Sequence, residues 1–274
     1  MAGRQLHIVE ELIHERAPKL VGSALWPAVK PVLYAVLDYR RAVSMADAVG
    51  TVSGDEALRY ISRLLHLKVT TTGLDRLPAS GRCVVVCNHP TGIADGIAVY
   101  DAVMQRRPDA IFFANADALR VNQRFAESLI PVEWVEAKRT REKTRVTLQA
   151  AKAAFEAERC VVLFPAGRLA RRNAEGELAD PAWAPTAVSM AQKYAAPIVP
   201  MHLKGPNSFW FHLFNRFSQE LRDITLFHEF LNKAGQRFDL TVGPVIAPDG
   251  VETERLKAYV EGELSLDPDR RYTA

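Results

Sequence analysis

The chain of 274 residues is long enough to bury a sizeable core, as one large domain or as one domain with a modest appendage. An apolar content of 48% with 24% charged residues is typical of a globular protein and excludes a disordered one. The formal net charge of +3 is too small to indicate a nucleic-acid partner, so basic residues matter only where they cluster.

The cysteines Cys83, Cys87 and Cys160 are an odd number and show no metal-binding spacing. We therefore expect them to be reduced core residues in a cytosolic protein. The first residues lack the continuous apolar stretch of a secretory signal. The sequence contains no run of about twenty apolar residues, so a membrane-spanning helix is not predicted.

Helices are predicted near the N-terminus over residues 4–17 and 42–66, where apolar side chains recur at helical spacing. The stretch between them, residues 20–37, is apolar but is interrupted by two prolines and a lysine and has basic residues at its edges. It is either a helical pair that covers the core or an interfacial segment that lies on a membrane with Trp and Leu inward. Residues 1–66 are thus expected to form an N-terminal helical segment, with membrane docking as one of two open roles.

Short apolar runs alternate with amphipathic stretches over residues 67–274. This alternation predicts an α/β domain with a largely parallel central sheet flanked by helices, in which reactive groups gather at the carboxyl ends of the strands. Polar residues 171–184 are expected to form a mobile loop or a short hairpin. The predicted strands are 69–72, 83–87, 110–114, 131–135, 160–164, 198–203 and 238–242, and the predicted helices are about 95–106, 119–129, 141–157, 186–194 and 252–264.

The most informative stretch is residues 83–96, in which an apolar run ends at Asn88 and His89 and a carboxylate follows at Asp95. At the end of a buried strand the two side chains can form a general base and the group that orients it. The alternative is a histidine held in a turn and an aspartate that caps a helix. Because no third ligand follows at a suitable spacing, a metal site is not indicated.

A second motif is Phe-Pro-Ala-Gly-Arg at residues 164–168. Gly167 after a strand lets backbone amides approach a ligand, and Arg168 can bind a phosphate or a carboxylate through two hydrogen bonds. The alternative is a strand end followed by a solvated basic loop. The densest basic run, residues 138–145, could form the solvated face of a helix or dock an acidic acyl-carrier protein or an anionic lipid surface.

The order and spacing of these motifs resemble the glycerolipid acyltransferase family, the lysophosphatidate acyltransferase-like enzymes, over roughly residues 70–245. That family carries a His–Asp motif on a strand-end loop and a later Phe-Pro-Glu-Gly-Thr-Arg motif. Two differences stand out here. Five residues separate His89 from Asp95 where four are usual, and Ala166 replaces the glutamate. Both features resemble the branch of hemolysin-like or lyso-ornithine-lipid acyltransferases, which carries a longer Asn-His-Pro-x-Gly-x-x-Asp-Gly motif.

The resemblance implies an O-acyltransferase that moves a fatty acyl group from acyl-CoA or acyl-carrier protein to the hydroxyl of a lysophospholipid or other lyso-lipid, without an acyl-enzyme. His89 would be the base and Asp95 its orienting partner. Asn88 and Gly92 would shape the turn beside the substrate, and Arg139, Gly167 and Arg168 would bind the anionic group of the acceptor. The expected substrate-binding residues are Asn88, Gly92, Arg139, Pro165, Gly167 and Arg168.

No metal and no bound organic cofactor is implied, and no nucleic acid is an expected partner. The expected location is cytoplasmic, peripherally associated with the inner face of the cell membrane. Two alternatives stay open: a thioester or lipid hydrolase, and a catalytically inactive peripheral lipid-binding protein. An aromatic cluster would serve as packing, border an acyl tunnel or touch the membrane. It comprises Phe209, Trp210, Phe211, Phe214 and Phe217.

Overall fold

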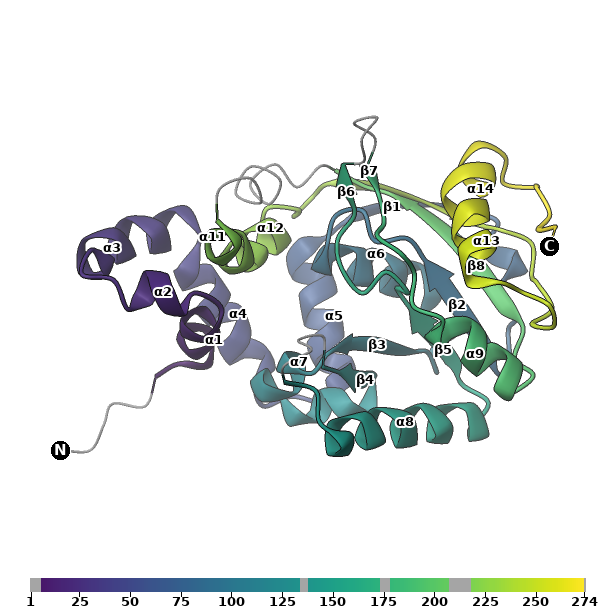
Figure 1. Ribbon diagram of the computed structural model, residues 1–274, viewed down its shortest axis with the longest axis horizontal. Helices are drawn as coiled ribbons and strands as arrows, with labels where there is room; N and C mark the ends of the chain where they lie inside the picture. The colour runs from purple at the N-terminus through teal and green to yellow at the C-terminus, as the bar shows by residue number, and fades with distance from the viewer. Residues whose placement is uncertain (1–5, 134–137, 173–177, 207–217, 274) are drawn as a thin grey trace.

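The computed structural model describes residues 6–133, 138–172, 178–206 and 218–273 (Figure 1). The strands are β1 (Lys68–Thr72), β2 (Cys83–Cys87), β3 (Ile111–Asn115), β4 (Leu129–Val132), β5 (Cys160–Leu163), β6 (Arg171–Arg172), β7 (Leu178–Ala179), β8 (Ile198–Lys204) and β9 (Arg237–Val242). Seven of them form one sheet in the order β1-β9-β8-β2-β5-β3-β4. Strands β8, β2, β5, β3 and β4 are parallel, and the one antiparallel pairing lies between β8 and β9. The predicted α/β fold with a largely parallel sheet is confirmed.

The helices are α1 (Ile8–Arg16), α2 (Pro18–Val21), α3 (Trp26–Val36), α4 (Tyr39–Val49), α5 (Gly54–Leu65), α6 (Ile93–Val103), α7 (Asp117–Val121), α8 (Arg141–Glu156), α9 (Thr186–Lys193), α11 (Gln219–Ile224), α12 (Leu226–Leu231), α13 (Thr253–Ala258) and α14 (Leu264–Leu266). Two 3₁₀ turns, η1 (Leu74–Arg76) and η2 (Gln123–Glu127), and a π-helical turn, η4 (Tyr259–Glu263), complete the described elements.

The central strands are buried on both faces, which explains why their sequences are continuously apolar rather than alternating. Along β2, Cys83, Val85 and Cys87 belong to one hydrophobic cluster, together with apolar residues of α1, α4, α5 and α6. Val84 and Val86 point to the opposite face and join a second cluster with residues of α8, α9 and α13. Layers of helices thus cover both faces, and all three cysteines are buried and free of disulfides.

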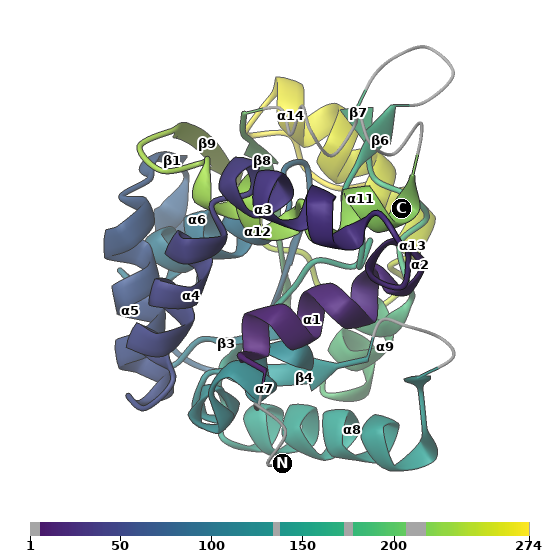
Figure 2. The same ribbon diagram turned by 90° about the vertical axis from the view of Figure 1, so that its left-hand side faces the viewer.

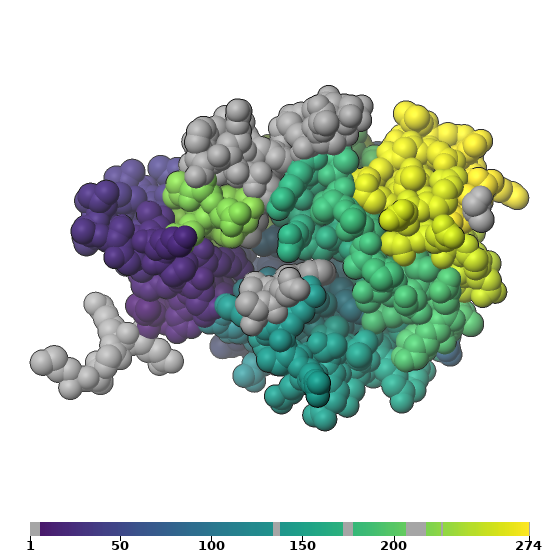
Figure 3. Space-filling model, in the orientation of Figure 1, coloured from purple at the N-terminus to yellow at the C-terminus, as the bar shows by residue number. Residues whose placement is uncertain are grey.

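The N-terminal helices and the C-terminal helices α13 and α14 lie at opposite ends of the molecule (Figures 1 and 3). The predicted helix 42–66 consists of α4 and α5. It is interrupted before Ser53, which accepts from the backbone N–H of Glu56 and receives the reciprocal contact of a capping box. The apolar stretch 20–37 is mostly helical, as α3. Among the described residues, no helix has the length and apolar character needed to cross a bilayer.

Two predicted elements need correction. The helix expected over 119–129 consists of α7 and the turn η2. The backbone of Asn122 is extended, and its side-chain amide donates to the carbonyls of Val49 and Val52, so the helix ends there. The strand expected over 131–135 begins earlier, at Leu129, and its described part ends at Val132. The polar excursion 171–184 contains the antiparallel hairpin β6–β7, one of its two predicted forms.

Candidate active site

His89 follows the carboxyl end of β2, and Asp95 lies in the first turn of α6. The Nδ1 atom of His89 lies 2.9 Å from Oδ2 of Asp95. Asp95 is fully buried, whereas 17% of the His89 side chain is exposed. One ring nitrogen of the histidine is therefore engaged by a buried carboxylate, and the ring remains accessible from solvent.

The Asp95 carboxylate also caps α6. Its Oδ2 accepts from the backbone N–H groups of Thr91 (2.8 Å) and Gly92 (3.0 Å), and its Oδ1 accepts from the Thr91 hydroxyl. A helix N-terminus favours a negative charge, so these donors keep the carboxylate in place. The capping role and the role of histidine partner, which the sequence left as alternatives, are thus performed by the same side chain.

The longer spacing between His89 and Asp95 is accommodated at Gly92. Its φ of 107° and ψ of −144° lie in a region that side chains with a Cβ rarely adopt. A Cβ at this position would also lie 3.1 Å from Cδ2 of Leu169, in the loop after β5. The loop between His89 and Asp95 and the loop that follows the Phe-Pro-Ala-Gly-Arg motif are therefore packed closely together at Gly92 and Leu169.

The buried side chain of Asn88 is used within the protein. Its Nδ2 donates to the carbonyl oxygen of Leu203 (3.0 Å), and its Oδ1 accepts from the backbone N–H of the same residue (2.6 Å). Asn88 thus ties the end of β2 to β8 and fixes the starting point of the His89 loop. Both polar atoms of the Asn88 side-chain amide are used in these two hydrogen bonds to Leu203.

The Phe-Pro-Ala-Gly loop follows β5, the direct neighbour of β2, so it lies beside His89 at the same edge of the sheet. The ring of Phe164 lies 4.7 Å from that of His89, centroid to centroid. Pro165 is buried and accepts from the N–H of Ala184 (2.9 Å). Gly167 has a φ of 60°, and its N–H donates to the Phe164 carbonyl (2.9 Å), so that amide is occupied within the turn. Arg168 is exposed.

Arg139 lies beyond the end of β4 and is exposed. Its Nε donates to the carbonyl of Glu133 (3.0 Å), whose carboxylate pairs with Lys143 (2.7 Å). A cavity of about 270 Å³ opens here, lined by Ala116, Pro131, Glu133, Glu142, Lys143, Val146 and Thr147. In the sheet, β4 lies three strand spacings, roughly 14 Å, from β2, the strand that His89 follows.

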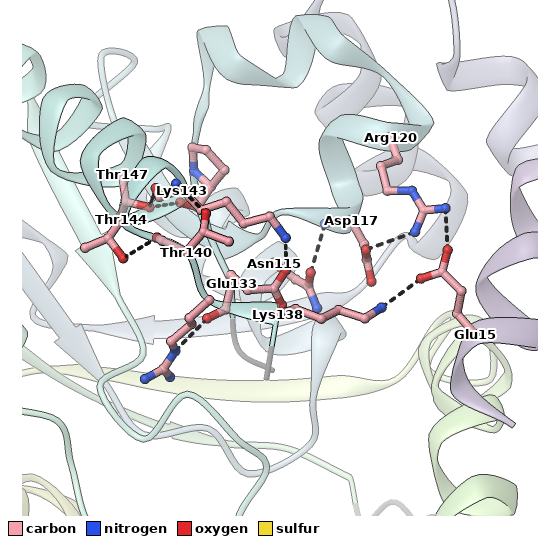
Figure 4. Close-up of polar contacts among 12 residues, drawn as sticks. Glu15, Asn115, Asp117, Arg120, Glu133, Lys138, Thr140, Lys143, Thr144 and Thr147 are labelled. Carbon is pink, nitrogen blue, oxygen red and sulfur yellow. Dashed lines mark hydrogen bonds and ion pairs between the residues drawn. The ribbon is translucent and has the colours of Figure 1, made fainter. Parts of the chain in front are cut away.

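This end of the sheet is joined to α1 by ion pairs (Figure 4). Glu15 accepts from Arg120 (2.8 Å) and from Lys138 (2.9 Å), and these hydrogen bonds lower the pKa of the Glu15 carboxyl to about 2. Arg16 pairs with Asp117 at 2.9 Å. The N-terminal helices therefore meet the main domain at the carboxyl ends of β3 and β4.

Sequence reasoning missed Asp180. Its two carboxylate oxygens lie 3.1 and 3.2 Å from the backbone nitrogen of His89, and one of them accepts from the indole N–H of Trp183 (2.9 Å). Burial is the main reason that the pKa of Asp180 rises to about 6, and nearby Glu261 adds to the rise. A single aspartate in a polar stretch, 91 residues from its partner, carries no sequence signal for this contact.

The aromatic cluster predicted at residues 209–217 lies outside the described residues. Within the described parts of the chain, no group of three His, Cys, Asp or Glu side chains has the arrangement of a metal site.

The acyltransferase family model matches residues 68–204, half of the 274-residue chain. The lyso-glycine lipid O-acyltransferase of Phocaeicola vulgatus is 29% identical over 199 residues, which are 70% of this chain and 69% of that protein. The lyso-glycine lipid O-acyltransferase of Bacteroides thetaiotaomicron is 26% identical over 159 residues, 58% of this chain and 56% of that protein. Among solved structures, the 1-acyl-sn-glycerophosphate (LPA) acyltransferase PlsC from Thermotoga maritima is 14% identical, with a TM-score of 0.48 over 95% of this chain and 96% of that one.

Proposed function

Because the chain belongs to the acyltransferase family, we propose that it moves a fatty acyl group from a thioester, acyl-CoA or acyl-carrier protein, to the hydroxyl of a lyso-lipid. The observation that carries this proposal is the 2.9 Å contact between His89 and the buried Asp95, next to the Phe-Pro-Ala-Gly loop at one edge of the sheet. The lyso-lipid class of acceptor agrees with the two relatives, which are lyso-glycine lipid O-acyltransferases.

In the proposed reaction, Asp95 accepts the Nδ1–H of His89, which leaves Nε2 unprotonated. Nε2 takes the proton of the acceptor hydroxyl as its oxygen attacks the thioester carbonyl. The C–S bond then breaks, and the leaving thiolate receives that proton from the imidazolium. The products are an ester and a free thiol, and no acyl-enzyme forms. The absence of a Gly-x-Ser-x-Gly sequence agrees with direct transfer.

We assign the binding of the acceptor's head group to exposed guanidinium groups that follow strands of this sheet edge. Arg168 is the first choice, because it follows β5, one strand from His89. Arg139 can reach the same acceptor only if the lipid extends along the sheet edge past β5 and β3. A lyso-glycine lipid is the first acceptor to test, followed by lysophosphatidate.

Helix α3 supports contact with a membrane surface. Leu25, just before it, and three of its residues form an exposed apolar stripe at helical spacing, in which Leu25 is 70% and Val32 is 64% exposed; the other members are Val29 and Val36. The surrounding residues include exposed cations, Lys19, Arg40 and Arg41. Figure 2, which faces this end of the molecule, shows α3 on the outside of the N-terminal helices. An amphipathic surface of this kind is suited to the boundary of an anionic bilayer.

The test offers a labelled acyl thioester, on CoA and separately on acyl-carrier protein, to a panel of lyso-lipids, and identifies products by mass. We expect an acylated lipid that forms only when acceptor is present, and no transfer by His89→Ala. The matched control is His228→Ala, which removes another histidine hydrogen-bonded to an aspartate (3.1 Å to Asp38), in a pair between α12 and the residue before α4. Release of free fatty acid without acceptor would support a hydrolase instead, and liposome binding without turnover would support an inactive lipid-binding protein.

A further inference from the structure

Both backbone polar groups of His89 are held by the segment that follows the Phe-Pro-Ala-Gly loop. The N–H of Ala170 donates to the His89 carbonyl at 2.9 Å, and the His89 N–H donates to the carboxylate of Asp180 at 3.1 and 3.2 Å. We propose that Asp180 is a positioning residue, which holds the main chain of the catalytic histidine while Asp95 holds its side chain. This inference rests on the proposed function, in which His89 is the base.

The surroundings of Asp180 favour this role over a general structural one. The residue is 5% exposed, and among the described residues no lysine or arginine pairs with it. Its carboxylate accepts from the N–H groups of His89 and Trp183, and its own N–H donates to Glu261 at 2.7 Å. A buried carboxylate is costly without a cation beside it. The fold keeps this one against the main chain of His89, and the two residues interact electrostatically, so the carboxylate favours the positive charge that the imidazole acquires during the proposed reaction.

Two consequences for catalysis follow from this arrangement. The direction of Nε2 depends on where the His89 main chain sits, and a displacement of about 1 Å can cost roughly 100-fold in rate. The negative charge of Asp180 also favours the imidazolium that forms when His89 takes the proton. Neither effect requires contact between Asp180 and a substrate.

The first measurement compares Asp180→Asn with the wild-type protein. We expect kcat to fall roughly 10- to 100-fold, with KM within about threefold and an unchanged thermal midpoint at pH 7.5 or above. Trp183→Phe keeps the carboxylate on His89 but removes the indole donor, so it should retain most of kcat. Asp239→Asn, at an exposed position of β9, is the control for the substitution itself. An unchanged kcat in Asp180→Asn, or an equal loss in Trp183→Phe, would overturn the proposal.

The second measurement asks whether Asp180 acts through His89. Since Asp95 and Asp180 hold the same residue, the loss in the double variant Asp95→Asn/Asp180→Asn should be smaller than the product of the two single losses. Losses that multiply would contradict the inference.

A third measurement does not depend on turnover. Hydrogen exchange of the peptide that contains His89 should accelerate in Asp180→Asn and not in Asp239→Asn. If the wild-type protein transfers no acyl group, the proposed function is wrong. The contact between Asp180 and the His89 N–H is then still tested by the hydrogen-exchange rate of the His89 peptide. If transfer occurs but neither exchange nor kcat responds to Asp180→Asn, only the inference fails.

Discussion

At the scale of single residues, the carboxylate of Asp95 has two roles: it caps α6, and it holds the His89 ring with the same oxygen atom. It accepts from the backbone of Thr91 and Gly92 and also holds His89. A serine or asparagine would cap the helix as well. Only an anion also stabilises the charged imidazolium, which is the physical reason to expect aspartate here.

We expect Asp95→Asn to lower kcat by roughly 10² to 10⁴-fold, because the amide can hold the wrong tautomer of His89 and adds no negative charge. The variant should also lose roughly 1–3 kcal/mol of stability, since donors buried around the carboxylate lose an acceptor. Steady-state kinetics and thermal unfolding of the same preparation measure both effects. A stable variant with wild-type kcat would contradict the assigned role.

Gly92→Ala tests the turn that absorbs the long spacing. The backbone at φ 107° excludes a Cβ, and Leu169 stands 3.1 Å from where it would lie, so we expect a loss of roughly 1–3 kcal/mol together with reduced turnover. Gly250→Ala is the matched control, because Gly250 also has a positive φ (71°) but has no heavy atom within 4 Å of the added carbon. Equal losses of unfolding free energy in the two variants would show that the contact with Leu169 is unimportant.

The raised pKa of the Asp180 carboxyl leads to a prediction about how the folding stability depends on pH. Its pKa of about 6 in the folded protein lies above the ordinary value of 3.8 for an aspartate, so this group stabilises the fold fully below the unfolded pKa, and that stabilisation is lost as the pH rises through 6. The difference between the two pKa values corresponds to about 3 kcal/mol of folding free energy. Among the described residues, the titratable groups that interact with it electrostatically include His89, Glu261 and the thiol of Cys87, and Glu261 is in turn paired with Lys257.

The difference in unfolding free energy between wild type and Asp180→Asn should therefore shift in favour of wild type as the pH falls from 7.5 to 4.5. Urea unfolding at the two pH values measures it, and Asp239→Asn, being exposed, should show no such change. A difference that does not depend on pH would mean that Asp180 has an ordinary pKa.

At the scale of elements, the helices that the sequence placed well are those with a strong apolar period and a recognisable cap. Helix α5 is the clearest, because Ser53 and Glu56 mark its beginning in the sequence. The prediction of a single helix over residues 119–129 was wrong because no cap in the sequence marks where the helix ends. The short elements of this region are separated by Asn122, whose partners Val49 and Val52 lie about seventy residues earlier in the chain.

The apolar stripe of α3 gives a prediction that belongs to one element. Leu25→Ser/Val32→Ser should weaken binding to vesicles that contain anionic lipids by roughly tenfold or more, because both side chains are exposed and would be buried only in the bilayer. Stability should change by no more than about 0.5 kcal/mol per site. Leu266→Ser, in α14 at the opposite end of the molecule, removes a leucine that is even more exposed and is the control. Equal vesicle binding by all three proteins would exclude α3 as the contact.

At the scale of the whole molecule, the boundary between residues 66 and 67 does not coincide with a break in the core. Val9, Ala46 and Leu65 belong to the same hydrophobic cluster as Val85 of the central strand. The N-terminal helices thus cover one face of the sheet in addition to carrying the exposed stripe of α3. The two roles that the sequence left open are compatible.

A chain that begins at residue 67 should therefore fail to fold cooperatively, because it exposes the sheet face that α5 and its neighbours cover. Circular dichroism melting and the soluble yield, compared with the full chain in the same buffer, measure this. A cooperative melt of residues 67–274 would establish that the domain is independent.

The sequence by itself determined the α/β class, the strand-end position of His89 and the proximity of Asp95 to it. All three depend on local features: apolar runs, glycine positions and the five residues between His89 and Asp95. Only the tertiary structure decided which distant groups complete the site. The contact of Asp180 with His89 and the tie from Asn88 to Leu203 join residues that lie far apart in the chain, and the position of Arg139 beyond β4 depends on strand order; no local pattern encodes any of these. The hydrogen bonds between Asn88 and Leu203, 115 residues apart, form because β2 and β8 are parallel neighbours, and this edge of the sheet exists only once the sheet is assembled.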